Sequence, residues 1–343
     1  MKALKYFVFI LILLIVGSCV YVGVQPSSYD IIRTKTIKAP VNVVFEQVND
    51  YKKWYDWSPW VEKDSTLQFE YPEKTSGEGG SYSWIGKEGK GSMKTLAVHK
   101  QDSITQELQF EGMSPSTVYW KFNKVSEGTE VAWGMKADEL GLIQKAFILF
   151  YGGMDKMIGP DYERGLEKLD SVAIESMNKF SVEIKGIKEY GGGYYLYKTT
   201  NATNANISQM MAQQYGSIGA FMGQNQIQMN GMPLTIYQEM NMDDGTVIMS
   251  NGLPVSEKIE INDDSGILCG YIPKTKVVKT VLKGNYTHLS KAWTETMTYI
   301  AKEGIELSEI KPFEIYTTDP GNYPNPADWL TEIYVPIKTT SNN

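Results

Sequence analysis

The chain has 343 residues, enough for two domains, and a net charge of -7 from 33 Lys and Arg against 40 Asp and Glu. This acidic balance, without a helix-turn-helix signature or a basic helix, argues against a nucleic-acid-binding surface. Two cysteines, Cys19 and Cys269, are too few for a disulfide framework, and His99 and His288 are too few for a histidine-based metal cluster. The sequence therefore predicts no metal and no cofactor.

The first predicted element is an apolar helix over residues 6–24, which contain no charge. Such a helix would be about 28 Å long, close to the roughly 30 Å hydrocarbon core of a bilayer. We interpret residues 1–28 as a transmembrane anchor. The alternative is a lipoprotein with a cleaved signal, because Val16-Gly-Ser-Cys19 resembles the motif that precedes a lipidated cysteine. The apolar run continues past Cys19, which favours the anchor.

The positive charges do not decide the orientation of this span. Lys2 and Lys5 precede it, and Arg33, Lys35 and Lys38 follow it. A short N-terminal tail before a single span favours the extracytoplasmic, periplasmic side for the rest of the chain.

Residues 29–176 are predicted to form the next domain, which begins with a strand at 31–38 and a helix at 41–49. Strand-like runs separated by turn residues follow at 67–71, 80–86, 91–100, 104–111, 117–125 and 129–136. From residue 140 to about 177 the pattern is helical, and we expect kinks at Gly152-Gly153 and Gly159-Pro160.

This order of elements, together with four short sequence motifs, resembles the SRPBCC (START-like, polyketide-cyclase-like) superfamily. The motifs are Ile37-Lys-Ala-Pro40, Trp54-x-x-Trp57-Ser-Pro-Trp60, Gly128-Thr-Glu-Val-Ala-Trp133 and Tyr162-Glu-Arg-Gly-Leu166. The resemblance implies a helix-grip fold, in which a curved antiparallel sheet surrounds a long C-terminal helix and leaves an apolar cavity for a lipid-like or aromatic ligand. It implies no particular reaction.

The aromatic residues of this domain are its candidate ligand contacts. Trp57 and Trp60, which we expect near a loop, are either ligand-binding residues or core residues. Trp120 and Trp133 lie within predicted strands, and there the core interpretation is favoured.

Residues 177–343 contain a duplicated pattern. Met232-Pro-Leu-Thr-Ile-Tyr237 is followed by Gly252-Leu-Pro-Val255, and Lys311-Pro-Phe-Glu-Ile-Tyr316 is followed by Ile333-Tyr-Val-Pro-Ile337. Predicted helices at 206–224 and 289–302 precede these words, and predicted strands at 193–198 and 276–282 precede the helices. Each half thus reads strand, helix, strand, strand, which indicates one supersecondary unit used twice, with a cleft along the pseudo-two-fold axis.

The duplicated pattern resembles the GyrI-like (AraC/BmrR-type) effector-binding domain. The resemblance is carried by Ile315-Tyr316-x-x-Asp319-Pro320 and Thr331-Glu-Ile-Tyr-Val-Pro-Ile337. It implies an α+β fold for the chain as a whole. It also implies binding of cationic, amphipathic or apolar small molecules between the repeats, often against a central carboxylate.

Glu332 is the predicted carboxylate of this site. In a strand over residues 331–337, Glu332 and Tyr334 point to one face, and Ser250 is the equivalent of Glu332 in the first repeat. A buried carboxylate costs several kcal/mol if it is unpaired, and a cationic ligand would offset that cost. The alternative is a solvated glutamate on an edge strand. The other predicted ligand-binding residues are aromatic: Tyr237, Tyr286, Trp293 and Tyr316.

The favoured interpretation is a membrane-anchored sensor or carrier that binds a small apolar or amphipathic molecule. Without a DNA-binding domain, its signal would pass to an unidentified protein partner, or its role would be sequestration. The alternative is a hydrolase of small electrophilic substrates, with Glu332 as general base. A third interpretation, a scaffold, predicts that the protein's own side chains fill both pockets.

Overall fold

The computed structural model describes residues 2–87, 89–203, 205–241, 245–261 and 265–338. The chain divides into two compact units, residues 1–176 and 177–343. Met1 and residues 339–343, which the predicted anchor and second domain include, lie outside the described residues.

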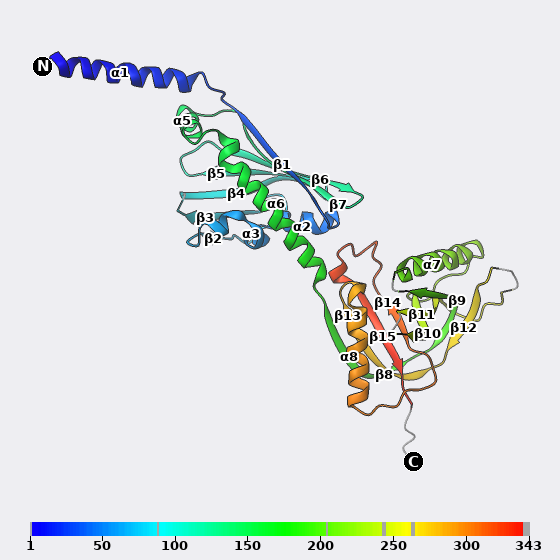
Figure 1. The fold of residues 1–343 in the computed structure, drawn as a ribbon. Helices are drawn as coiled ribbons and strands as arrows, with labels where there is room; N and C mark the ends of the chain where they lie inside the picture. Colours follow the sequence, from blue (N-terminus) through cyan, green and yellow to red (C-terminus); the bar gives the residue numbers. More distant parts are fainter. Residues whose placement is uncertain (1, 88, 204, 242–244, 262–264, 339–343) are drawn as a thin grey trace. The chain divides into compact units, whose positions relative to one another are not determined.

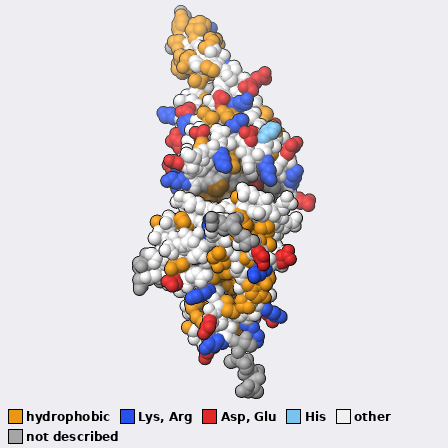
Figure 2. Space-filling view, turned by 90° about the vertical axis from the view of Figure 1, so that its right-hand side faces the viewer, with side chains coloured by type: hydrophobic (Ala, Val, Ile, Leu, Met, Phe, Trp, Pro, Cys, Tyr) orange, Lys and Arg blue, Asp and Glu red, His pale blue; other side chains and the backbone are white. Residues whose placement is uncertain are grey.

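The first helix, α1 (Lys2–Gly23), is apolar along its length. Within the described ranges it is the one helix long and apolar enough to cross a membrane, with a mean hydropathy of 2.5 over Leu4–Gly23. Hydrophobic side chains cover the N-terminal end of the chain in Figure 2. The helix is consistent with a signal sequence or with a single membrane anchor.

The sheet of the first unit has seven antiparallel strands in the order β1-β7-β6-β5-β4-β3-β2 (Figure 1). They are β1 (Tyr29–Ile37), β2 (Gln68–Glu70), β3 (Ser81–Gly86), β4 (Gly89–His99), β5 (Ser103–Phe110), β6 (Ser116–Val125) and β7 (Gly128–Ala137). The predicted succession of antiparallel strands is confirmed.

Three short helices connect β1 to β2: α2 (Val41–Asn49), α3 (Tyr51–Trp57) and α4 (Pro59–Lys63). Trp57 is the last residue of α3 and Trp60 lies in the first turn of α4, on either side of the extended Ser58. The Asp50 side chain caps α3 by accepting a hydrogen bond from the Lys52 amide. Ser58-Pro59 then begins α4 with proline in its first turn, where the missing N–H costs nothing.

The helical stretch that follows the sheet forms α5 (Leu142–Phe150) and α6 (Met154–Asn178). The break between them falls at Gly152-Gly153, where φ is +85° and +104°, a conformation that glycine adopts without steric strain. α6 continues through Gly159-Pro160 without ending.

Aromatic rings fill the space between the sheet and α6. Trp133 stacks on Trp120 with ring centroids 4.5 Å apart and on Tyr162 of α6 with centroids 3.8 Å apart. Trp57 contacts both tryptophans edge-on, and Trp54 packs against all three. The core of this unit is therefore an aromatic cluster built from strands and helices together.

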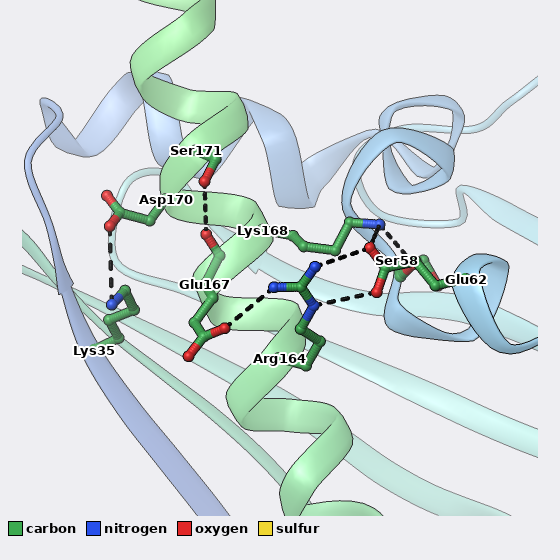
Figure 3. Close-up of polar contacts among 8 residues, drawn as sticks. All are labelled: Lys35, Ser58, Glu62, Arg164, Glu167, Lys168, Asp170 and Ser171. Atoms are coloured by element: carbon green, nitrogen blue, oxygen red, sulfur yellow. Dashed lines mark hydrogen bonds and ion pairs between the residues drawn. The ribbon is translucent and has the colours of Figure 1, made fainter.

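Ion pairs join the other side of α6 to α4 and β1 (Figure 3). Arg164 and Lys168 both bind Glu62, at 3.1 Å each, and Lys35 lies 3.8 Å from Asp170. The two cations lower the pKa of Glu62 to about 2. Of these pairs, Arg164–Glu62 is exposed on both sides, and such a pair contributes little to stability.

The sheet of the second unit has eight strands in the order β12-β9-β11-β10-β14-β15-β13-β8, and every pairing is antiparallel. The strands are β8 (Ser181–Tyr190), β9 (Gly193–Thr203), β10 (Leu234–Asn241), β11 (Thr246–Val255), β12 (Leu268–Ile272), β13 (Thr275–Lys283), β14 (Phe313–Tyr316) and β15 (Leu330–Pro336). The helices are α7 (Ile207–Gln224), α8 (Leu289–Lys302) and the short 3-10 helices η1 (Tyr286–His288) and η2 (Pro326–Asp328).

The register places α7 and α8 on the same face of this sheet. Asn251, Thr235, Glu314, Ile333 and Thr280 lie opposite one another in turn on β11, β10, β14, β15 and β13. Residues paired across antiparallel strands share a face. Gln214 of α7 accepts a hydrogen bond from Asn251, and Thr296 of α8 donates one to Thr280, so both helices cover this face.

The two halves of the unit are related by an approximate two-fold axis between β10 and β14. The order strand, helix, strand, strand occurs as β9-α7-β10-β11 and again as β13-α8-β14-β15, as predicted. The amide of Tyr237 donates to the Pro312 carbonyl, and the amide of Tyr316 donates to the Pro233 carbonyl, both at 3.0 Å. Thr235 and Glu314 are paired between these two reciprocal backbone hydrogen bonds.

Candidate ligand-binding site

Glu314 lies at the centre of the second unit, on the face that α7 and α8 cover. Its side chain is fully buried. The indole N–H of Trp293, on α8, donates to one carboxylate oxygen, and the Tyr316 hydroxyl donates to the other at 2.6 Å. A helix and a strand of the second repeat therefore hold the carboxylate from two directions.

Aromatic rings surround the Glu314 carboxylate. Tyr237, the first-repeat equivalent of Tyr316, meets Trp293 edge-to-face with centroids 5.6 Å apart. Tyr316 in turn contacts Tyr286 of η1 at 5.5 Å and Tyr215 of α7 at 6.4 Å. The rings come from both repeats and from both helices, so the site forms only when the two halves pack together.

Burial disfavours the charged form of Glu314. Burial raises the pKa of Glu314, while hydrogen bonds with Tyr316, Trp293 and Tyr237 act in the opposite direction. None of the ion pairs found among the described residues involves Glu314. Burial, with the Glu314 charge nearby, also raises the pKa of Tyr237 and Tyr316, so both hydroxyls stay protonated.

The corresponding position in the first repeat is neutral. Thr235 donates to Asn251 at 2.6 Å, and Asn251 donates to Gln214 at 2.7 Å. The Tyr215 hydroxyl lies 2.8 Å from the Thr235 hydroxyl. A hydrogen-bonded chain of neutral side chains thus occupies one half of the axis, and the other half holds a carboxylate that pairs with no cation in the described part of the chain.

A second buried polar group lies on the same face next to this site. Thr331, on β15, is paired with Tyr316 and fully buried. Its hydroxyl oxygen has no hydrogen-bond partner among the described residues. A ligand that reached this strand could satisfy it.

The structure places Glu332 and Tyr334 on the opposite face of the sheet. Ile333 lies opposite Glu314, and side chains alternate along β15, so its two neighbours point away from the helices. Glu332 forms a 2.8 Å ion pair with Lys279 and accepts a hydrogen bond from Tyr334, and its side chain is 22% exposed. Tyr334 stacks on Phe313 in a separate apolar cluster on that face.

The predicted site residues therefore separate into groups. Tyr237, Tyr286, Trp293 and Tyr316 come together on the helix-covered face, while Glu332 and Tyr334 lie on the other face. The sequence analysis did not select Glu314, although it lies in the same repeated motif, residues 311–316, as Tyr316. Alternation along residues 313–316 places Glu314 beside Tyr316, and that signal could have found it.

Trp57 and Trp60 belong to the first unit, at the aromatic core. Trp57 is completely buried, and its indole N–H donates to the Gln47 carbonyl at 3.2 Å. Trp60 is partly exposed and contacts Trp133 and Tyr162 edge-on.

A surface groove of about 530 Å³ lies elsewhere in this unit, along β2, β3 and β4. Its lining includes Tyr71, Tyr82, Lys94 and Glu107 but neither Trp57 nor Trp60. The groove and the two tryptophans are therefore separate features.

Comparison with known families accounts for both units. Residues 30–173 match the family described as polyketide cyclase / dehydrase and lipid transport, and residues 194–338 match the GyrI-like small molecule binding domain. The chain is an SRPBCC domain followed by a GyrI-like domain. Both are small-molecule-binding domains, so the predicted families are confirmed, and the Glu314 cluster lies within the GyrI-like domain.

Solved structures similar to the chain show low sequence identity. The crystal structure of the EcmrR C-terminal domain is 18% identical, covers 47% of this chain and 99% of its own, and has a TM-score of 0.41. Protein CV1439 from Chromobacterium violaceum is 14% identical, covers 42% of this chain and 96% of its own, and has a TM-score of 0.32. A search of curated proteins found no match.

Proposed function

We propose that the GyrI-like domain binds a small aromatic or amphipathic cation against Glu314. The observation that carries this proposal is a fully buried carboxylate that aromatic side chains hold and that no cation among the described residues neutralises. Leaving such a charge unpaired is costly, and a ligand cation would offset that cost. Contacts between the cation and the rings would add roughly 0.5–2 kcal/mol.

Within this proposal α1 is retained as a membrane anchor, and both domains lie on the extracytoplasmic side. The SRPBCC domain takes an apolar ligand, for which the partly exposed Trp60 is the candidate contact and Trp57 supports it from the core. The GyrI-like domain senses or sequesters the cation, and any signal passes to a protein partner. The chain's net charge of -7 supports an output that does not involve nucleic acid.

The test compares Glu314→Gln with Glu332→Gln, because the two carboxylates lie on opposite faces of the same strand pair. Full-length protein in detergent would be titrated with an aromatic quaternary ammonium dye and with its uncharged analogue of similar shape. We expect Glu314→Gln to weaken dye binding by at least about tenfold, or about 1.4 kcal/mol, and to change binding of the neutral analogue little.

The Glu332→Gln titration distinguishes the two candidate carboxylates. Unchanged dye binding in this variant would support Glu314 as the ligand carboxylate. The reverse pattern, in which only Glu332→Gln loses the dye, would refute the Glu314 site and assign the ligand to the Lys279 face. Equal binding of the dye and its neutral analogue by wild type would contradict a charge-selective site.

A hydrolase is the second candidate function, and the raised pKa of Glu314 favours it, because a general base benefits from such a shift. In this version Glu314, or Glu332 on the other face, activates water, and a tyrosine serves as the acid. Turnover of a panel of small esters and epoxides by wild type, Glu314→Gln and Glu332→Gln tests it. Hydrolysis by wild type that one of the two substitutions abolishes would establish an enzymatic function. Dye binding without any turnover would support the binding function instead.

A further inference from the structure

Helix α5 exposes most of its large apolar residues and buries its one charged side chain. Ile143 and Phe150 are 86% and 83% exposed, whereas Lys145 is 8% exposed. The other exposed apolar residues of the segment are Leu142, Phe147 and Tyr151. With 3.6 residues per turn, all five lie within one half of the helix surface. A surface helix of a water-soluble domain shows the opposite arrangement, so this face requires an apolar partner.

Hydrogen bonds join α5 to the C-terminal end of α1. The Lys145 ammonium donates to the carbonyl of Gly23, the last residue of α1, at 3.4 Å and to that of Gln25 at 2.9 Å. The amide of Leu140, just before α5, donates to the Ser27 carbonyl at 2.8 Å. A cation at a helix C-terminus also complements the helix dipole. Figure 1 shows α5 beside this end of α1.

The length of α1 fixes the depth of this junction. Leu4–Gly23 spans 20 residues, and a helix of that length is about 30 Å long, equal to the hydrocarbon thickness of a bilayer. If α1 crosses the membrane, Gly23 lies at the boundary between hydrocarbon and headgroups. Lys145 then holds α5 at the same level, where phenylalanine and tyrosine side chains are favourable.

We propose that α5 is an interfacial helix whose exposed face (Leu142, Ile143, Phe147, Phe150 and Tyr151) inserts into the bilayer surface beside α1. The proposal rests on the membrane anchor proposed above. It names a lipid surface as the occupant of this face because the anchor and the face are connected directly. It also gives the SRPBCC domain a second attachment to the membrane, at the junction of α5 and α6.

Depth-dependent quenching tests this arrangement in the full-length chain. Cys19 and Cys269 would be replaced by serine, and Phe150→Cys would be labelled with an environment-sensitive fluorophore. The protein would be reconstituted into phosphatidylcholine vesicles that contain lipids with a nitroxide near the headgroup. The matched control is Glu127→Cys in the exposed β6–β7 turn. Since Tyr29 pairs with Ala137 and Ile37 with Thr129, that turn lies about 27 Å along the strands from the start of β1.

We expect the label at position 150 to be quenched severalfold more strongly than the label at 127, with a blue-shifted emission. Equal, weak quenching at both positions would overturn the proposal. So would a label at 150 that ignores nitroxide lipids but is quenched by a second labelled copy, since the face would then bind another chain. The intact mass of protein isolated from its host membranes tests the anchor separately, because a cleaved α1 lowers the mass whatever the quenching shows.

Discussion

At the scale of single residues, Glu314 links stability to pH. Burial raises its pKa above the ordinary value of 4.5, so the folded protein keeps this proton at a pH where the unfolded chain has lost it. The free energy of unfolding therefore falls as pH rises from 4.5 through the raised pKa. Ligand binding should show the opposite dependence, because a cation prefers the ionised carboxylate.

We predict that Glu314→Gln removes this pH dependence. Without ligand, the wild-type GyrI-like domain should lose up to about 1.4 kcal/mol of stability per pH unit between the two pKa values, and the variant should lose none of this contribution. Thermal unfolding of both proteins between pH 4.5 and pH 8 measures the difference. A constant difference across that range would show that Glu314 titrates at its ordinary pKa, against the burial described here.

The residue scale is also where sequence prediction was least complete. Four aromatic site residues were predicted and do surround one carboxylate, but that carboxylate is Glu314. The choice between Glu314 and Glu332 depends on which face of a short strand the helices cover. The sequence of residues 311–337 alone does not indicate the covered face, because that face is set by the packing of α7 and α8 on one side of the sheet.

At the scale of secondary-structure elements, the sequence was more informative. The predicted helices at 206–224 and 289–302 appear as Ile207–Gln224 and Leu289–Lys302, because apolar spacing determines long amphipathic helices. The helices α3 and α4 were missed. Trp54 and Trp57 of α3 are buried by packing against distant strands, and this tertiary contact outweighs the local pattern.

The turn between β6 and β7 provides a test of how two elements fit together. Gly128 has a φ of +138°, and a Cβ added there would lie 2.2 Å from the Ile37 carbonyl oxygen, where β1 leads into α2. Gly112 has a φ of +77°, with nothing within 4 Å of its added Cβ. Gly112 therefore tests backbone strain alone, whereas Gly128 combines a more strained φ with contact against a neighbouring element.

We expect Gly112→Ala to lower the stability of the SRPBCC domain by about 1–2 kcal/mol, the usual cost of a left-handed alanine. Gly128→Ala should cost about 3 kcal/mol or more, because the backbone of residues 37–39 must also move. Urea unfolding of both variants measures this. Equal losses of stability in the two variants would mean that the backbone between β1 and α2 moves to accommodate the added methyl group at no energetic cost.

At the scale of the whole molecule, each unit has its own sheet and its own buried core. Such units can unfold separately. The aromatic cluster of the SRPBCC domain and the apolar clusters of the GyrI-like domain are built from different residues.

Calorimetry of the full chain should accordingly show two transitions. A cationic dye bound at Glu314 should shift only the transition of the GyrI-like domain to higher temperature. At a free dye concentration 100 times the Kd, it should raise that domain's free energy of unfolding by about 2.7 kcal/mol. Because Glu314→Gln is expected to weaken dye binding at least about tenfold, the same dye concentration should stabilise the variant by about 1.4 kcal/mol or less. A single cooperative transition that moves as a whole with the dye would contradict the separation of the two domains.

Thr235 and Glu314 lie opposite each other at the centre of the GyrI-like domain. Because only one of them is acidic, the two halves of the duplicated fold differ in charge at equivalent positions. A repeated scaffold with an acid in both halves would accept a doubly charged rod or a single charge at either end. Under the proposed binding at Glu314, the hydroxyl in the first half leaves an elongated ligand with one positive end a single favourable orientation, with its uncharged end toward Tyr215 and α7.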